Sequence, residues 1–353
     1  MPQKTDFTAP SLEETRHLYE SAARLKELAP WTWMDETEIF GVQHPETGEL
    51  GFVSVMGMAG EHFAVAIYQG AEGLYGLQDF AADAEMANPQ QLLDIPQLQA
   101  SFEDRDMLDK PDREVIKQLG LKFRGAHAWP MFRSYRPGFM PWFVTAQEAR
   151  LITYALTQML EVAPRVKDNP AILSAEDNEA GEIYLVRVAR REGDGLVWED
   201  RMMRVPPPEP VRLPVVVDVE VVGQLKELPR RSLALEIDLL SVPAAIGEKG
   251  ERPARPYLLM LADAQSGMIV GTEMMTVEDS LRGMHEQIPM LLAALLAQAG
   301  IVPGEIRVRS ELLAELLHPL AKILNIKIRE ADRLPGIDAV MDSMFSWMMD
   351  GEL

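Results

Sequence analysis

Two carboxylates share one face of an apolar segment in the C-terminal half of the chain. Residues 233–240 read Leu-Ala-Leu-Glu-Ile-Asp-Leu-Leu, a pattern that predicts a β-strand. Because side chains alternate across a strand, Glu236 and Asp238 point to one side, and Leu233, Leu235, Ile237 and Leu239 point to the other. Two buried carboxylates are unfavourable unless they pair with cations, bind a metal ion or reach solvent. The pair is therefore a candidate for metal-dependent chemistry or for an ion-pair cluster.

A second segment whose residue types could bind a ligand or partner lies in the N-terminal half. Between Glu114 and Glu148 the chain contains no acidic residue, although Asp and Glu outnumber Lys and Arg by 55 to 34 overall. Interleaved cations and aromatic rings suit stacking on nucleic-acid bases or anchoring a protein interface. The alternative is that the rings cover the core and the arginines pair with acids elsewhere. The candidate binding residues are Lys117, Lys122, Arg124, Trp129, Arg133, Tyr135, Arg136 and Trp142.

Several other kinds of site are excluded by composition and spacing. The chain has no cysteine, which rules out disulfides, thiolate zinc sites and cysteine nucleophiles. Its six histidines are scattered without metal-ligand spacing. There is no glycine-rich loop before a lysine and no Gly-x-Ser-x-Gly turn. Asp263 follows a predicted strand and is interpreted as a turn residue.

The elements around Glu236 and Asp238 predict an α/β domain with a mixed sheet. Antiparallel strands come first, and helices and strands then alternate, so we expect helices on both faces of the sheet. The predicted strands are Val215–Val222, Leu233–Leu240, Tyr257–Ala262, Met268–Met275, Glu305–Arg309 and Ile326–Glu330. The predicted helical regions are Val277–Ala299, a helix capped by Ser310 that runs to Leu324, and Ile337–Met349 with Ile337, Met341, Met344 and Met348 on its buried stripe.

The N-terminal half has the pattern of an α+β domain. Two helices are predicted to begin after Ser11 and Thr145, each with a glutamate three residues later that completes a capping box. The other elements are strands at Glu38–Gln43, Leu50–Met56 and Phe63–Tyr68, a strand or loop at Leu98–Glu103, a helix at Asp112–Leu119, an ordered loop through Pro130, Pro137 and Pro141, and a hairpin of Glu182–Arg190 with Gly195–Arg204. Prolines at 206, 207, 208, 210 and 214 predict an extended linker. We therefore expect domains at 1–204 and 215–353, joined by residues 205–214.

The C-terminal half resembles the core of RNase H-like enzymes of the integrase and DDE-transposase kind. Residues 235–238 and 257–271 resemble the first three strands of that core, which implies that Asp238 matches the first catalytic Asp. Residues 300–309 are similar to the segment that ends at the second Asp, and Arg309 stands at that place. The helix near 336–344 resembles the one that carries the third carboxylate, so Asp342 is its match, with Asp338 one turn earlier.

Arg309 decides between the hypotheses that this resemblance suggests. A cation at this position repels the divalent metals that such enzymes use. The first hypothesis is therefore a non-catalytic RNase H-like module, a pseudoenzyme without a cofactor, that serves protein interaction. The alternative is a nuclease or phosphotransfer enzyme that holds Mg²⁺ or Mn²⁺ with Glu236, Asp238 and Asp342. A third hypothesis is a nucleic-acid binder that uses the segment 117–136.

The whole-chain charge and hydropathy define the expected partners and compartment. The net charge of −21 repels phosphate backbones, so a protein is the expected partner rather than a nucleic acid. The N-terminus has no apolar signal core, and the longest apolar stretch, Ile288–Val302, is interrupted and too short to span a bilayer. We expect a cytoplasmic protein without membrane contact. The 117–143 region, with Trp31, Trp33 and residues 51–57, resembles the N-terminal half of uncharacterised bacterial two-domain proteins.

Overall fold

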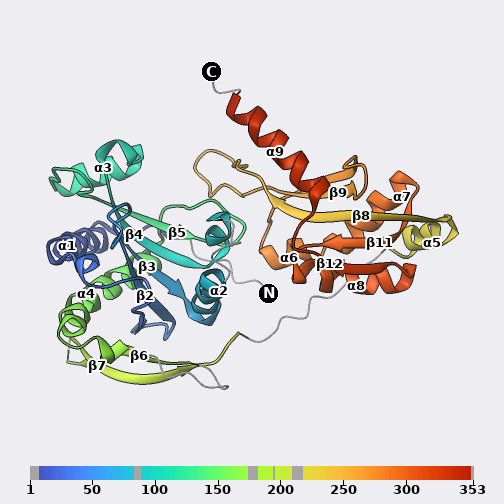
Figure 1. Ribbon diagram of the computed structural model, residues 1–353. Coiled ribbons are helices and arrows are strands. Elements are labelled where there is room, and N and C mark those ends of the chain that lie inside the picture. Colours follow the sequence, from blue (N-terminus) through green and yellow to red (C-terminus); the bar gives the residue numbers. More distant parts are fainter. Residues whose placement is uncertain (1–7, 83–88, 174–181, 194, 209–217, 351–353) are drawn as a thin grey trace. The chain divides into compact units, whose positions relative to one another are not determined.

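The chain forms two compact units, each built around its own β-sheet (Figure 1). The computed structural model describes residues 8–82, 89–173, 182–193, 195–208 and 218–350, with the backbone alone for residue 89 and residues 344–350. The first unit comprises Met1–Pro137 and Pro141–Glu209, and the second comprises Gly138–Met140 and Pro210–Leu353. Both are mixed helix-and-sheet regions, which agrees with the predicted two-domain α and β character. The predicted linker lies largely outside the described residues.

The first unit contains a seven-stranded sheet in the order β5-β4-β3-β2-β1-β6-β7. Neighbouring strands are antiparallel except β1 and β6, which are parallel. Its strands are β1 (Phe40–Gln43), β2 (Leu50–Met56), β3 (Ala64–Gln69), β4 (Gln97–Glu103), β5 (Trp129–Tyr135), β6 (Glu182–Glu192) and β7 (Gly195–Val205). The predicted hairpin of residues 182–204 is confirmed as β6 and β7.

Helices cover both faces of this sheet. The helices α1 (Leu12–Leu28) and α4 (Ala146–Asp168) share one core with β2, β3 and β4, and both begin at the capping boxes that the sequence predicts. The helix α2 (Gly70–Ala82) packs on the opposite face through Leu74. The remaining helices are α3 (Lys110–Leu119) and the short η1 (Pro30–Thr32), η2 (Pro89–Asp94), η3 (Arg105–Met107) and η4 (Pro170–Leu173).

The structure corrects two parts of the N-terminal prediction. Residues 129–135 form the edge strand β5, which pairs with β4 along its whole length, where a loop was expected. An edge strand tolerates Pro130, whose nitrogen has no hydrogen to donate. The helix α2 was not predicted, because its glycines at 70, 73 and 76 weaken the helical pattern. Gly73 is nevertheless required, since a Cβ there would lie 2.7 Å from the carbonyl oxygen of Pro96.

The second unit contains a five-stranded sheet in the order β10-β9-β8-β11-β12. The central strand β8 is antiparallel to β9 and parallel to β11, and β10 and β12 form the two edges. The strands are β8 (Arg230–Ser241), β9 (Tyr257–Asp263), β10 (Ile269–Met275), β11 (Val302–Val308) and β12 (Lys327–Glu330). The helices are α5 (Val219–Glu227), α6 (Leu281–His285), α7 (Ile288–Ala299), α8 (Glu311–Leu324) and α9 (Pro335–Asp350).

The predicted strand Val215–Val222 is wrong from Val219 onward, where the chain forms α5. The Asp218 side chain accepts hydrogen bonds from the N–H groups of Glu220 and Val221 and so begins the helix. Val222 and Leu225 are buried one helical turn apart. Capping and this spacing outweigh the strand preference of the valines, and residues 215–217 lie outside the described part.

Alternation along the strands gives this sheet two unlike faces. Leu235, Ile237 and Ile306 point into a core shared with α5, α7 and α8. Met260 and Ala262 point to the other face, where Leu334 and Ile337 at the start of α9 cover them. Of the predicted stripe on the last helix, Ile337 is buried and Met341 is partly buried, and the Met344 and Met348 side chains lie outside the described ones. Glu236 and Asp238 share the α9 face of the sheet.

Candidate functional site

The register between β8 and β11 brings Asp238 and Arg309 together. Glu236 lies beside Arg307 in this parallel pair. Moving two residues along both strands leads to Asp238 and Arg309 on the same face. The Arg309 Nε lies 2.8 Å from Asp238 Oδ2, which makes the contact an ion pair.

Asp338 completes this cluster from the first turn of α9. Its Oδ1 accepts a hydrogen bond of 2.6 Å from Arg309 Nη2, so the guanidinium bridges two carboxylates. Asp342, the residue that the resemblance matches to the third carboxylate, is exposed one turn further along α9. The structure therefore places Asp338, rather than Asp342, beside Arg309. We call Asp238, Arg309 and Asp338 the Arg309 cluster.

Glu236 serves the start of α9. The residue is 0% exposed, and its Oε2 accepts hydrogen bonds from the N–H groups of Gly336 and Ile337 at 2.8 and 3.1 Å. A carboxylate is favourable here because a helix N-terminus carries partial positive charge. Gly336 allows this approach, since a Cβ at that position would lie 3.0 Å from Glu236 Oε2. Glu236 thus points to α9 and not to Arg309.

Burial and pairing act in opposite directions on the charges of the Arg309 cluster. Burial raises the pKa of Asp238, and the Arg309 charge and the Leu239 N–H group offset this only in part. Burial alone would lower the pKa of Arg309, but its hydrogen bond to Asp338 and the charge of Asp238 outweigh that effect and raise it. Arg309 therefore keeps its positive charge, which stabilises the ionised form of Asp238.

The carboxylates do not fit the divalent-metal site of an integrase-type enzyme. Such a site needs several oxygens that converge on the ion without a nearby cation. Asp238 Oδ1 accepts a hydrogen bond from Leu239 N, and its Oδ2 contacts Arg309. Within the described part of the chain, no group of three or more His, Asp or Glu side chains is arranged to hold a metal ion. The geometry is that of an ion-pair cluster.

The predicted basic and aromatic residues divide into two sets. Arg133 is buried and paired with Asp112 and Asp109 at 2.7 and 2.9 Å. The Tyr135 hydroxyl donates to Gln99, and the Trp142 backbone pairs with that of Ser134. These three residues stabilise the first unit. Arg136 is partly buried and Arg124 is exposed, whereas Lys117, Lys122 and Trp129 line a common hollow.

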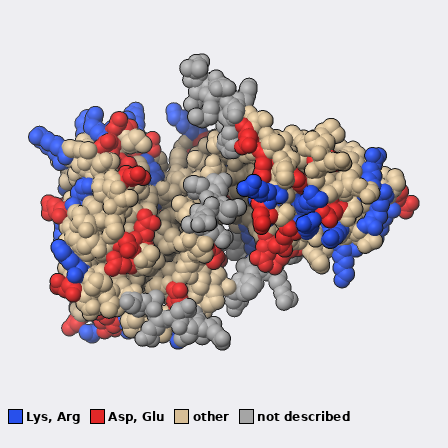
Figure 2. Space-filling view, viewed as in Figure 1, with Lys and Arg blue, Asp and Glu red and all other residues tan. Residues whose placement is uncertain are grey.

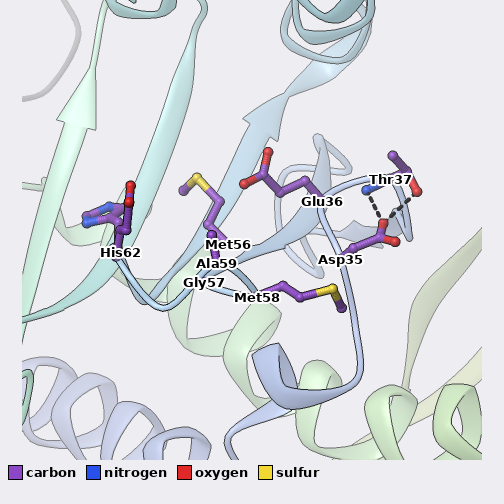
Figure 3. Close-up of a pocket in the computed structure, with 9 residues that line it drawn as sticks. Asp35, Glu36, Thr37, Met56, Gly57, Met58, Ala59 and His62 are labelled. Atoms are coloured by element: carbon purple, nitrogen blue, oxygen red, sulfur yellow. Dashed lines mark hydrogen bonds between the residues drawn. The ribbon is translucent and has the colours of Figure 1, made fainter.

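A different hollow, of about 520 Å³, lies between residues 35–37 and 56–62 of the first unit (Figure 3). Asp35 turns toward Thr37 and accepts hydrogen bonds from its N–H and hydroxyl groups. His62 lies on the opposite side of the hollow from Asp35. The Asp35 carboxylate is occupied by Thr37 and His62 lies across the hollow, so these two polar side chains do not converge on one point.

Comparison with known proteins matches the N-terminal and C-terminal parts of the chain to two different families. Residues 16–187 match the family model of a domain of unknown function, DUF7309, and residues 222–345 match that of another, DUF6930. No curated protein matches the chain. The predicted combination of two uncharacterised domains is confirmed, and neither family brings an activity. Among the described residues, no helix has the length and apolar character needed to cross a membrane.

Proposed function

Starting from a chain that joins two uncharacterised domains, we propose that the second unit is a degenerate RNase H-like module. In this proposal it binds a protein partner and performs no metal-dependent phosphotransfer. The arrangement of the sheet supports the fold assignment. The first strand of the module is central, an antiparallel hairpin extends the sheet on one side, and two parallel strands extend it on the other. This agrees with the element order on which the resemblance rests.

The bridge from Arg309 to Asp238 and Asp338 is the observation that carries the non-catalytic part. The guanidinium contacts the carboxylate that would have to bind the first metal ion. A divalent ion at Asp238 would have to displace Arg309, because the two cations would repel each other and compete for the same carboxylate. The alternative, a metal-dependent nuclease, requires that movement.

The edge strand β10 supports a protein partner. Met268, Ile269 and Met274 lie in or beside this strand and are 67%, 47% and 52% exposed. An edge strand can accept an extended peptide as a further strand through backbone hydrogen bonds. Such a peptide would also cover these apolar side chains. The net charge of −21 disfavours a nucleic acid at the same surface.

Metal titration tests the non-catalytic part. Calorimetry with Mn²⁺ should give no saturable binding to the wild-type chain, and nuclease assays with Mg²⁺ or Mn²⁺ should give no cleavage. Arg309→Asp supplies a carboxylate beside Asp238 and should create measurable Mn²⁺ binding. Arg329→Asp makes the same charge change on the edge strand β12, which β11 separates from Asp238, and serves as the control. Metal binding by the wild-type chain that Asp238→Asn abolishes would overturn the proposal.

Peptide selection tests the partner surface. Extended peptides are first selected from a random library for binding to the full wild-type chain. These peptides should bind the Ile269→Lys variant more weakly than the wild-type chain. Ile323→Lys on α8 is a matched control, because Ile323 is 43% exposed and Ile269 47%. Peptides that bind both variants equally, or the absence of any binder, would contradict recognition through β10.

A further inference from the structure

A basic hollow of about 480 Å³ lies beside α3 in the first unit. We call it the α3 pocket. It is formed by η3, by α3 and the loop after it, and by the first residue of β5. Its lining consists of Arg105, Lys110, Arg113, Glu114, Ile116, Lys117, Gly120, Leu121, Lys122 and Trp129.

The charge of this pocket is opposite to that of the chain. Five lining residues are cations, and Glu114 is the sole acid among the lining residues. Lys110 pairs with Glu114 at 3.7 Å, whereas Arg105, Arg113, Lys117 and Lys122 form no ion pair with any residue that the structure describes. Basic side chains gather over α3 at the upper left of Figure 2. Like charges so close together repel one another, and a bound anion would relieve that repulsion.

The pocket also has an aromatic wall. Trp129 is partly buried, and the edge-on ring of Phe123 packs against it with centroids 5.9 Å apart. The Arg105 guanidinium lies 5.7 Å from the centre of the indole ring. Ile116 and Leu121 add apolar surface beside it. Positive charge next to a held aromatic ring suits a ligand with both phosphates and a planar base.

We infer that the α3 pocket binds a nucleoside polyphosphate, with its phosphates among Arg113, Lys117 and Lys122 and its base against Trp129. The volume is that of a small-molecule site. The charge of the chain favours a small ligand over a long strand. The pocket cations attract a mononucleotide, because protein charges farther away than the Debye length of about 8 Å are screened at physiological salt. A long strand would extend past the pocket over a protein with a net charge of −21.

Calorimetry on the full chain tests this inference with four probes: ATP, inorganic tripolyphosphate, adenosine and a thymidine oligonucleotide. ATP should bind most tightly, tripolyphosphate more weakly, and adenosine without measurable affinity. Absence of saturable ATP binding at millimolar concentration would overturn the inference. An oligonucleotide that binds while ATP and tripolyphosphate do not would also overturn it, in favour of a strand-binding surface.

Two variants locate the binding. Lys117→Glu should weaken ATP and tripolyphosphate by about tenfold or more, since it replaces a phosphate-binding cation by an anion. Lys322→Glu is the matched control, because both lysines are exposed in the last turn of a helix. Trp129→Leu should weaken ATP but not tripolyphosphate, whose unchanged affinity would show that the pocket is intact. Equal effects of the two lysine variants would overturn the assignment. The pocket lies in the first unit, so its failure would leave the proposal for the second unit untouched.

Discussion

Each unit contains an arginine that bridges two aspartates, and the two bridges differ in burial and in the number of hydrogen bonds that the guanidinium donates. Arg133 in the first unit has a side chain only 10% exposed, whereas that of Arg309 in the second is 38% exposed. Arg133 forms a two-pronged contact with Asp112, a further bond to Asp109 and one to the Phe132 carbonyl oxygen. Arg309 makes one contact with each of its aspartates.

In the proposed RNase H-like assignment, this difference separates a structural arginine from one that occupies the position of a catalytic carboxylate. The Arg133 partner Asp112 also caps the first turn of α3, so the pair fixes a helix to the sheet edge. The Arg309 cluster instead lies just after β11 and beside the first turn of α9, and in the proposed assignment a carboxylate at position 309 would face Asp238. Arg133 should therefore matter chiefly to stability, and Arg309 chiefly to what Asp238 can bind.

Arg133→Met should give the largest loss of stability. It leaves Asp112 buried without a cation, which destabilises proteins by about 3–5 kcal/mol. The measurement is urea unfolding followed by tryptophan fluorescence, which reports mainly on the first unit because only Trp347 lies in the second. Arg190→Met is the control, since Arg190 is 65% exposed on β6 and should change stability by less than about 0.5 kcal/mol. A small effect of Arg133→Met would remove the distinction between the two bridges.

Arg309→Met should cost the second unit less, about 1–2 kcal/mol, because Arg309 and Asp338 are 38% and 40% exposed and the buried Asp238, whose pKa is already raised, can take up a proton. Hydrogen exchange measured by mass spectrometry should show faster exchange in β8 and in the start of α9. Peptides from the first unit should exchange as in the wild-type chain. A loss as large as that for Arg133→Met would mean that Arg309 is a structural residue as well.

Local signals in the sequence were sufficient for much of the fold. The capping boxes at Ser11 and Thr145 predicted the starts of two helices. The alternation of side chains along a strand predicted that Glu236 and Asp238 share one face of the sheet. Local signals failed where tertiary context decided the outcome. Val219 carries strand preference but follows a helix cap, and Pro130 suggested a loop although an edge strand accepts it.

The candidate sites were predictable only in part, for a geometric reason. Asp338 and Asp342 lie one turn apart on the same helix, and the choice between them depends on where α9 begins over the sheet. The predicted binding residues include Lys117, Lys122 and Trp129 of the α3 pocket but not Lys110 or Arg113, which precede the acid-free run after Glu114. Lys110, Arg113 and Lys117 are spaced to share one side of a helix. That spacing was a usable signal, whereas the approach of Arg105 from η3 was not visible in the sequence.

Gly336→Ala probes the contact between Glu236 and α9. Alanine favours a helix over glycine by up to about 1 kcal/mol. The new Cβ, however, would lie 3.0 Å from Glu236 Oε2 and 3.2 Å from Gly267 Cα. We expect a net loss of up to about 1 kcal/mol, seen as faster exchange at the start of α9. The control Gly223→Ala in α5 has open space around its Cβ and should stabilise the unit instead. Stabilisation by both changes would show that α9 can shift away from Glu236.

The smallest expected effect concerns pH, and it has opposite signs in the two units. In the first unit, hydrogen bonds from Arg165 lower the pKa of Asp200, so its stabilisation is present above the unfolded pKa and is lost as pH falls through the folded one. Burial raises the pKa of Asp238 above its ordinary value of 3.8, so the folded state holds its proton longer than the unfolded state does. The Asp238 contribution to stability therefore falls as pH rises from 3.8 through the raised value.

Asp238→Asn should remove that decline. The variant should be more stable than the wild-type chain near neutral pH by less than about 1 kcal/mol, and the difference should vanish at pH values below the unfolded pKa. Asp200→Asn should show the reverse, with lower stability at neutral pH and no difference in acid. Hydrogen exchange across this pH range, corrected for intrinsic rates, measures both units in one sample. Destabilisation of the second unit by Asp238→Asn at neutral pH would mean that the ion pair with Arg309 outweighs burial, and the two bridges would then be alike.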